Sequence, residues 1–215
     1  MKPNLLKNKL NEGKFCAGTW ISLCSSIGAE VIGLVGFDWC LIDMEHGAGD
    51  YQTLVSQLQA LEAAGDTTPI VRVQWNDPVV IKRVLDAGAY GVMVPGIKTV
   101  DEAKRAIAAI KYPPEGFRGI ASVRGAKYGV DTTYLKEANS QMAMFLQIET
   151  TEAVENVEAI LDLPGIDVCF IGPNDLAADM GHIGNLTHAD VQAAIKKVED
   201  AANARNIPLG TVSGG

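Results

Sequence analysis

The sequence predicts an α/β fold in which a single parallel sheet closes into a (β/α)8 barrel, and three observations lead to this prediction. Short apolar runs of strand length alternate with amphipathic helical segments along all 215 residues. Several of these runs end on charged or polar side chains, which is typical of the carboxyl edge of a barrel. The first strand-to-helix turn carries no GxGxxG motif, which disfavours the alternative, a doubly wound open sheet with a dinucleotide site.

Seven apolar runs are expected to form the strands. They cover residues 15–23, 39–44, 70–73, 90–94, 142–148, 168–171 and 207–212. The second run is almost entirely apolar, as expected for a strand whose two sheet faces are both covered. Runs 142–148 and 168–171 are joined by a helical segment, so these two strands should lie parallel and adjacent, with a right-handed crossover between them.

Helix boundary signals separate the strands. The expected helices cover residues 25–35, 50–64, 79–87, 99–111, 133–139, 152–161 and 189–205, with a further short helix after Asp175. Gly65 and Gly88 are typical residues with which to end the second and third of these helices. Pro78 fits a first helical turn. Thr99 and Glu102 have the spacing of a capping box.

The connection over residues 112–130 is long and contains Gly and Pro, which indicates a functional loop rather than a spacer. The strand count stops at seven, one short of a closed barrel. We therefore expect one barrel domain over residues 1–215 that is incomplete at its C-terminus, because natural proteins avoid unpaired strand edges. Either the chain is a shortened form of a longer product, or the barrel is completed in another way.

Composition argues against several classes of protein. The formal net charge is −8 and no cluster of Lys and Arg offsets it, which argues against a nucleic-acid surface. The N-terminus lacks the apolar core of a signal peptide, and no apolar run approaches the roughly 20 residues of a membrane span. The four cysteines form no CxxC pair, so we expect free thiols in a reducing compartment. The sequence thus predicts an acidic cytoplasmic protein.

Two carboxylates stand at the ends of neighbouring predicted strands. Glu149 follows the run 142–148, and Asp175 comes soon after the run 168–171. Both should emerge at the carboxyl edge of the sheet, where they could hold a hard divalent cation. Solvated or helix-capping carboxylates would explain the same pattern. If a cation binds, water and substrate oxygens must complete its coordination, which favours Mg²⁺ or Mn²⁺ over a structural zinc site.

Further strand ends carry His46 and Arg72. An arginine in an apolar strand requires an anion, so Arg72 indicates either a carboxylate or phosphate ligand or a structural ion pair. His46 has a side chain that suits a general base, but for a lone histidine a loop residue without a catalytic role is the more common explanation. His182 and His188 lie in polar segments without a motif, and we expect them at the surface.

Carboxylates at this edge suggest aldol chemistry, because a cation chelated by a 2-oxoacid would polarise its ketone and stabilise an enolate. A Schiff-base lysine is the other solution to the same chemical problem. Lys98 is the nearest candidate for it, although it lies in a polar turn that leads into a helix.

Seven short motifs occur in order along nearly the whole chain. They are Gly18-Thr-Trp-Ile, Asp43-Met-Glu-His46-Gly, Arg72 with Trp75-Asn-Asp-Pro and Leu85-Asp86-Ala-Gly-Ala, Val94-Pro, Tyr112-Pro-Pro-Glu-Gly-Phe-Arg118-Gly, Gln147-Ile-Glu149-Thr and Gly172-Pro-Asn-Asp175-Leu. In these motifs the chain resembles the HpcH/HpaI family of class II pyruvate aldolases, whose barrel is of the phosphoenolpyruvate/pyruvate-domain type. The resemblance implies reversible cleavage of a 4-hydroxy-2-oxoacid to pyruvate and an aldehyde through a metal-stabilised pyruvate enolate. The substrate would be a 2-keto-3-deoxy sugar acid or a dicarboxylate, from sugar-acid or aromatic catabolism.

The resemblance also implies roles for individual residues. The metal ligands would be Glu149 and Asp175, and the ion would be Mg²⁺, Mn²⁺ or Co²⁺. The catalytic residues would be His46, Arg72, Asp86 and Asp43. Among them, Arg72 would bind pyruvate and stabilise its enolate, while His46 would transfer protons with Asp86 at the family position that pairs with it. The substrate pocket would be lined by Trp20, Arg72, Gln147, Gly172, Pro173, Asn174 and Asp175.

Two departures from the family pattern bear on the predictions. The segment 119–129 looks shorter than in the heptanedioate enzyme of this family, which leaves the aldehyde unassigned. The family's last strand and its C-terminal helix, which exchanges between subunits, are absent, although the family suggests a homo-oligomer, a hexamer built from dimers. Two alternatives stay open: an acyl-CoA lyase of the citramalyl or malyl type, and a non-catalytic barrel that binds a metal or a 2-oxoacid.

Overall fold

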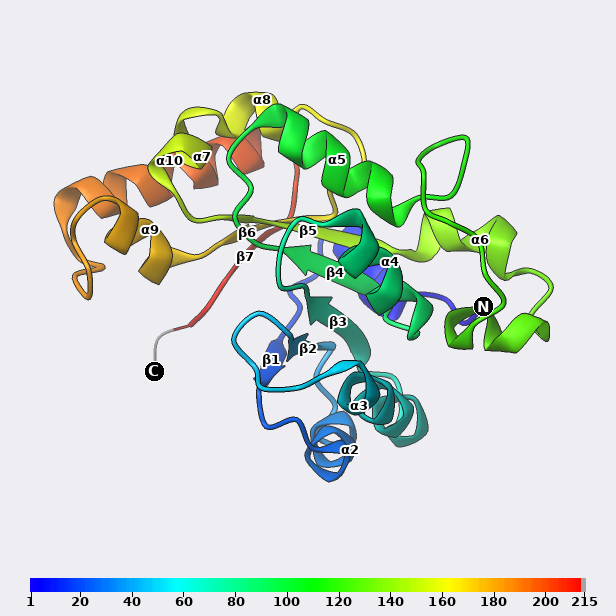
Figure 1. Cartoon of the computed structure of the whole chain (residues 1–215). Helices are drawn as coiled ribbons and strands as arrows, with labels where there is room; N and C mark the ends of the chain where they lie inside the picture. The colour runs from blue at the N-terminus through cyan, green and yellow to red at the C-terminus, as the bar shows by residue number, and fades with distance from the viewer. Residues whose placement is uncertain (214–215) are drawn as a thin grey trace.

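The protein is built around one sheet of seven parallel strands whose order in space is their order in the chain. The computed structural model describes residues 1–213. The strands are β1 Gly18–Ile21, β2 Trp39–Asp43, β3 Thr68–Arg72, β4 Gly91–Val94, β5 Ala143–Ile148, β6 Val168–Ile171 and β7 Leu209–Thr211. Figure 1 shows the sheet curled, with helices around its outer side. The seven predicted strands are confirmed, and the sequential order rules out a doubly wound sheet, in which the strand order reverses.

Helices connect the successive strands and cover the outer face of the sheet. They are α1 Leu5–Asn11, α2 Ser26–Val35, α3 Tyr51–Ala64, α4 Pro78–Asp86, α5 Val100–Ile110, the 3-10 segment η1 Arg124–Gly129, α6 Tyr134–Gln141, α7 Thr151–Glu155, α8 Val157–Leu161, α9 Pro173–Asp179 and α10 Ala189–Ala204. Because each crossover runs back along the sheet, the carboxyl ends of the strands meet at one edge and the helix C-termini approach the other. None of the helices in residues 1–213 is long and apolar enough to cross a membrane.

Local sequence signals explain most element boundaries. The predicted capping box is present at α5, where Thr99 accepts a hydrogen bond from the Glu102 backbone N–H and the Glu102 carboxylate accepts one from the Thr99 N–H. The predicted helix 152–161 is divided into α7 and α8 at Asn156, whose φ and ψ of −92° and 0° interrupt the helix. Its side-chain amide donates to the Lys98 carbonyl at 3.0 Å and ties this break to the loop after β4.

Two apolar layers fill the molecule. The larger one lies between the sheet and the outer helices, and the smaller one fills the inside of the curl. Its buried members are Leu6, Trp39, Leu41, Ile70, Met93, Ala143, Phe145, Val168 and Phe170. The aromatic rings touch one another across this interior, with centroids 5.7 Å apart for Trp39 and Phe145. The inside of the curl is therefore a packed core, as in closed barrels, and the strand ends at its carboxyl edge are where a barrel forms its site.

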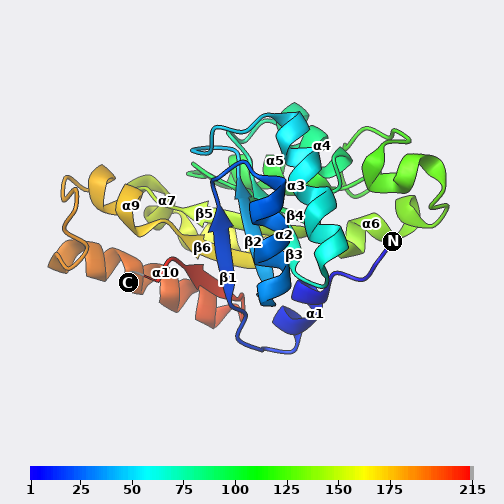
Figure 2. The same cartoon turned by 90° about the horizontal axis from the view of Figure 1, so that it is seen from below.

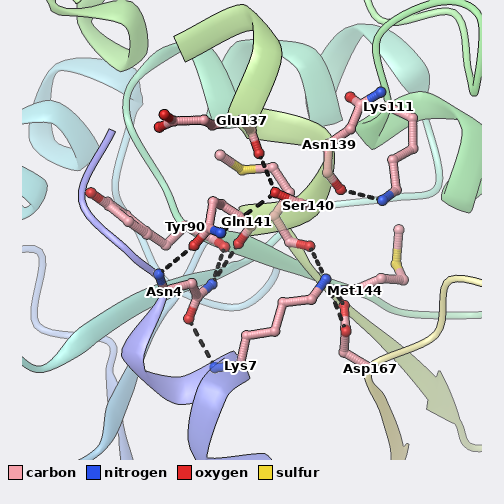
Figure 3. Close-up of polar contacts among 11 residues, drawn as sticks. Asn4, Lys7, Tyr90, Lys111, Glu137, Asn139, Ser140, Gln141, Met144 and Asp167 are labelled. Carbon is pink, nitrogen blue, oxygen red and sulfur yellow. Dashed lines mark hydrogen bonds and ion pairs between the residues drawn. The ribbon is translucent and has the colours of Figure 1, made fainter. Parts of the chain in front are cut away.

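Helix α1 covers the opposite end of the sheet, where the strands begin (Figure 2). The side-chain amide of Asn4 donates to the carbonyl oxygens of Tyr90 and Gln141 at 3.0 and 2.7 Å (Figure 3). Lys7 forms an ion pair with Asp167 at 3.0 Å, just before β6. These contacts join the N-terminal segment to the amino ends of β4, β5 and β6, so this segment covers the amino end of the sheet.

The sheet does not close between β7 and β1 within residues 1–213, since each pairs with only one neighbour. A groove of about 1040 Å³ lies between them and reaches the aromatic interior. Strand β1 begins at Gly18 rather than at residue 15, because Phe15 lies outside the sheet with 91% of its surface exposed. Strand β7 is shorter than the predicted run 207–212.

Candidate active site

A cavity of about 230 Å³ opens at the carboxyl edge of the sheet. Its walls contain eight of the predicted site residues, namely Trp20, His46, Arg72, Gln147, Gly172, Pro173, Asn174 and Asp175. Phe170, Ile171 and Val212 complete the lining, and the sequence had not indicated them. These residues come from β1, β3, β5 and β6 and from the segments that follow β2, β6 and β7, so the curl of the sheet is what gathers them.

Arg72, at the end of β3, is held by a bidentate ion pair. Its Nε and Nη2 donate to the two carboxylate oxygens of Asp43 at 3.0 and 2.6 Å, and its Nη1 lies 3.1 Å from Glu45. The register of the sheet places Asp43 directly beside Arg72 on the neighbouring strand β2. Both alternatives for Arg72 therefore hold in part, because the guanidinium forms a structural ion pair and also lines the cavity.

Asp43 is almost completely buried and acts on Arg72 rather than on the cavity. Burial disfavours its charged form, but the Arg72 guanidinium and the backbone N–H groups of Glu45 and His46 outweigh this and hold the pKa of Asp43 below its usual range. Asp43 does not line the cavity. Its contacts are those of a residue that orients the arginine, and its place among the catalytic residues stays a prediction.

Glu45 is a site residue that the sequence analysis missed. Its carboxylate lies 3.1 Å from Arg72 Nη1 and 3.8 Å from His46 Nε2. Burial, offset in part by Arg72 and His46, raises its pKa, and the charge of Asp175 raises it further. The chain turns directly after β2, where the N–H groups of Glu45 and His46 both donate to Asp43 Oδ1. This turn brings Glu45 to Arg72, and the spacing in the sequence did not indicate it.

His46 stands at the mouth of the cavity, with 70% of its side chain exposed. Its only charged neighbour among the described residues is Glu45. An exposed imidazole next to a carboxylate can accept and release protons at the cavity entrance.

Glu149 follows the last residue of β5 and is buried, and the charges of two other carboxylates act on it. One oxygen accepts the backbone N–H of Gly96 at 2.7 Å, and the other accepts the side-chain amide of Gln147. Burial raises its pKa, and the charges of Glu45 and Asp175 add to this against the two hydrogen bonds. Three carboxylates thus repel one another at the carboxyl edge, close to the single guanidinium of Arg72.

The donor set at this edge fits a hard divalent cation. A cation between Glu149 and Asp175 would remove the repulsion that raises the pKa of Glu149, and the groups around it are oxygen donors. Gln147 also indicates a ligand site at this cavity. Its buried Oε1 lies at the cavity wall and has no hydrogen-bond partner there. A Cβ at Gly172 would lie 2.7 Å from Glu149 Oε2, so only glycine lets β6 end this close to the carboxylate.

Asp86 is far from where the resemblance places it. It is the last residue of α4, at the amino edge of the sheet, while His46 follows the carboxyl end of β2. Its carboxylate instead accepts from Arg118 Nη2 at 2.9 Å. Within one chain Asp86 thus lies away from His46, because a helix that runs antiparallel to the strands ends on the opposite edge, and its catalytic role stays a prediction.

Arg118 explains why Asp86 matters for stability. Its side chain is fully buried against the rings of Tyr112 and Tyr134, and Asp86 is its only carboxylate partner among residues 1–213. We expect Asp86→Ala to lower the free energy of unfolding by about 3 kcal/mol, because it leaves a buried charge uncompensated. Urea unfolding measures this, with Asp66→Ala at an exposed aspartate as the control. Equal stability of the two variants would contradict the structural role.

Lys98 does not line the cavity, so the Schiff-base alternative has no nucleophile there. Its backbone N–H donates to Glu102 and its carbonyl accepts from Asn156, which places it in the cap of α5. No lysine among the described residues lines the cavity.

Comparisons with known proteins agree in fold and sequence. The family model described as HpcH/HpaI aldolase/citrate lyase matches residues 17–215. A 5-keto-4-deoxy-D-glucarate aldolase from Shigella boydii is 42% identical over 212 residues, which cover 98% of this chain and 82% of that protein. A crystal structure of a family protein from Burkholderia cenocepacia J2315 superposes with a TM-score of 0.95 at 40% identity, over 98% of this chain and 85% of that chain. The citrate synthase SbnG superposes with a TM-score of 0.89 at 27% identity, over 99% and 83% of the two chains.

A curled parallel β/α sheet with carboxylates and an arginine around a cavity at its carboxyl edge defines an enzyme of the barrel type. The chain belongs to the HpcH/HpaI aldolase/citrate lyase family. It is a carbon–carbon lyase of that family, which confirms the resemblance found in the motifs.

Proposed function

We propose that the protein is a divalent-metal-dependent class II aldolase that cleaves a 4-hydroxy-2-oxoacid reversibly to pyruvate and an aldehyde. The 5-keto-4-deoxy-D-glucarate aldolase of S. boydii suggests the sugar-acid class of substrate rather than a thioester. One observation carries the proposal: Arg72 and Asp175 line a cavity of about 230 Å³, and the charges of Asp175, Glu45 and Glu149 act on one another next to it. That volume suits a small acid.

Arg72 and the cavity wall would bind the 2-oxoacid. The guanidinium faces the cavity and is fixed by Asp43, so it is preorganised for the negative charge that develops on the C2 oxygen. Gln147 contributes the unpartnered Oε1, and Trp20 contributes an apolar wall whose ring centroid lies 6.0 Å from the Arg72 guanidinium carbon.

His46 would move the protons of the reaction. Cleavage requires that a base take the proton of the 4-hydroxyl group while the C3–C4 bond breaks and the aldehyde leaves. The bonding pair passes into the pyruvate enolate, and a proton then returns to C3 to form the methyl group. His46 at the cavity mouth can perform both transfers, and Glu45 beside it stabilises the imidazolium.

Glu149 and Asp175 would hold the divalent cation. When bound, the cation supplies a Lewis acid for the oxygens of the 2-oxoacid. The oxygen donors favour Mg²⁺ or Mn²⁺, with Co²⁺ as a further option. Gly96 and Gln147 each donate to one oxygen of Glu149, so they fix the orientation of this carboxylate before a cation arrives.

Exchange of the methyl protons of pyruvate in D₂O tests the proposal, because enolate formation needs no aldehyde. The ¹H NMR signal is followed with Mg²⁺ or Mn²⁺ and with a chelator. We expect metal-dependent exchange in the unmodified protein and none in Asp175→Ala. Absence of exchange at saturating metal and pyruvate would refute the proposed function and favour a protein that binds without turnover.

The pH dependence of this exchange should reveal the carboxylate cluster. Glu149 must be ionised to hold a cation, and its pKa lies above the usual 4.5, as does that of the neighbouring Glu45. Exchange should therefore fall as the pH is lowered while ordinary glutamates are still charged. Because cations compete with protons, raising Mg²⁺ from limiting to saturating should move this acid limb to lower pH. A limb that does not respond to Mg²⁺ would contradict the prediction.

The remaining predictions concern the complete fold of the enzyme, its oligomeric state and its location. We propose that the sheet is part of a (β/α)8 barrel whose missing pairing lies in the groove between β7 and β1. The single-domain assignment is supported by the continuous sheet. A homo-oligomer and a cytoplasmic location stay predictions, the latter supported by four free cysteines.

A further inference from the structure

A second cluster of possible metal ligands lies outside the proposed active site. It consists of His182, His188 and Asp190, and it is the only group of three such side chains with mutually close ligand atoms in the described part of the chain. The cluster is formed by the connection between α9 and α10, on the side of the molecule away from α2 and α3 (Figure 1). The sequence analysis had placed both histidines at the surface without a role.

The backbone of this connection brings the two imidazoles together. The His182 N–H donates to the Ala177 carbonyl at 2.7 Å, which fixes the first histidine at the end of α9. Asn185 then donates its N–H to the His182 carbonyl at 2.9 Å and accepts the His188 N–H at 3.2 Å. The rings are stacked, with centroids 3.5 Å apart and an interplanar angle of 17°. The fold of the loop thus places the two imidazoles next to each other, while the orientation of the rings would change when an ion binds.

The distances within the cluster suit a shared ion better than direct hydrogen bonds. Asp190 Oδ2 lies 3.6 Å from His182 Nε2 and 3.7 Å from His188 Nδ1, both beyond hydrogen-bond length. Ligands around a tetrahedral zinc ion, with bonds of 2.0–2.1 Å, lie about 3.4 Å apart. The three atoms are thus close enough to share one ion once the two imidazoles turn out of their stack, because a metal binds an imidazole nitrogen in the plane of the ring.

Two local effects act on a cation at this place. The cluster sits at the amino end of α10, whose dipole disfavours positive charge, and the Asp190 carboxylate in the first turn offsets this. His188 Nδ1 accepts the Asp190 N–H at 3.2 Å, a long hydrogen bond that a cation at Nδ1 would replace. Both imidazoles are half-buried and the carboxylate is exposed, so water can fill the remaining coordination positions.

We propose that His182, His188 and Asp190 form a second metal site, which binds a borderline cation such as Zn²⁺. Two imidazoles and one carboxylate favour Zn²⁺ or Cu²⁺ over Mg²⁺, whereas the oxygen donors of Glu149 and Asp175 favour the reverse. The two sites therefore differ in the metals that they select. Because α9 begins with cavity residues and ends beside His182, an ion in the second site would brace the segment that carries Asp175.

Copper EPR tests this site directly, with Cu²⁺ as the probe for a donor set that contains nitrogen. The measurement uses the full chain with Glu149→Ala and Asp175→Ala, so that the proposed active site does not contribute and its failure would not affect the result. We expect one bound Cu²⁺ with hyperfine coupling to two nitrogens, and a large excess of Zn²⁺ should displace it, because the same donor set binds Cu²⁺ more tightly than Zn²⁺. A melting curve should also show a higher unfolding temperature with Zn²⁺ than with Mg²⁺.

Only three histidines occur in the chain, which supplies a matched control. In the same background, His182→Ala and His188→Ala should each remove one nitrogen coupling and weaken Cu²⁺ binding at least about tenfold. His46→Ala should leave both couplings and the affinity unchanged. If His46→Ala abolishes binding while the other two variants retain it, or if no nitrogen coupling appears, the second site does not exist.

Discussion

Replacement of Arg72 by alanine is expected to cost more stability than any other single change at the site. The substitution leaves the buried Asp43 and the half-buried Glu45 without their guanidinium partner. Removing one partner of a buried ion pair costs about 3–5 kcal/mol, so we expect a loss of that size in the free energy of unfolding at neutral pH. Pyruvate exchange should also fall strongly, because the charge that faces the C2 oxygen is gone.

The pH dependence of the free energy of unfolding of Arg72→Ala shows whether the lost ion pair causes the loss of stability. In the unmodified protein the pKa of Asp43 is lowered, so its contribution to stability is present above the ordinary value and disappears as the pH falls through the lowered one. The variant lacks this contribution and should lose further stability as Asp43 ionises. Urea unfolding should therefore show a difference in the free energy of unfolding between the two proteins. This difference should be largest near pH 7 and should decrease below about pH 4.

Two controls complete the Arg72 prediction. Arg105→Ala, at an exposed position of α5, should change stability little. Arg72→Lys keeps the charge but loses the bidentate geometry, so it should recover part of the stability and less of the exchange rate. A difference that stays constant from pH 3 to 7 would show that lost packing, rather than the ion pair, causes the effect.

Substitution of Glu149 by glutamine should separate stability from activity. The variant removes a charge from a buried position whose pKa is raised by burial and by Glu45 and Asp175. A group with a raised carboxyl pKa destabilises the fold once the pH exceeds that pKa, so without metal the variant should unfold at a higher temperature at pH 7. Gln147 can turn its unpartnered Oε1 toward the new amide and keep the local hydrogen bond.

In the same variant the rate of metal-dependent pyruvate exchange should fall at least about 100-fold. Residues that only hydrogen-bond to a metal ligand already change metal affinity or activity by about 10–100-fold when they are replaced. Glu155→Gln, at an exposed position of α7, is the matched control and should retain exchange. Calorimetry in chelator and NMR with Mg²⁺ give the two readouts. Undiminished exchange in Glu149→Gln would remove this residue from the proposed metal site, whatever its effect on unfolding.

The sequence alone predicted the fold class and the arrangement of elements. Alternation of apolar runs with helical segments is a local property, and the seven strands appear in the predicted order. Eight pocket residues were also predicted, because polar side chains at strand ends and ordered motifs are visible in one dimension. The nearness of Glu149 and Asp175, which follow the neighbouring strands β5 and β6, comes from the same rule, since parallel strands end at one edge.

Only the tertiary structure determines which charged side chains form ion pairs. Asp43 pairs with Arg72, Glu45 joins them, and Asp86 pairs with Arg118, and none of these pairs can be read from spacing. The contact between His182 and His188 likewise depends on how one loop folds back. The physical reason is that hydrophobic periodicity specifies elements and faces, whereas the interaction of two charges depends on distance and burial, which arise only when the sheet curls and the helices pack.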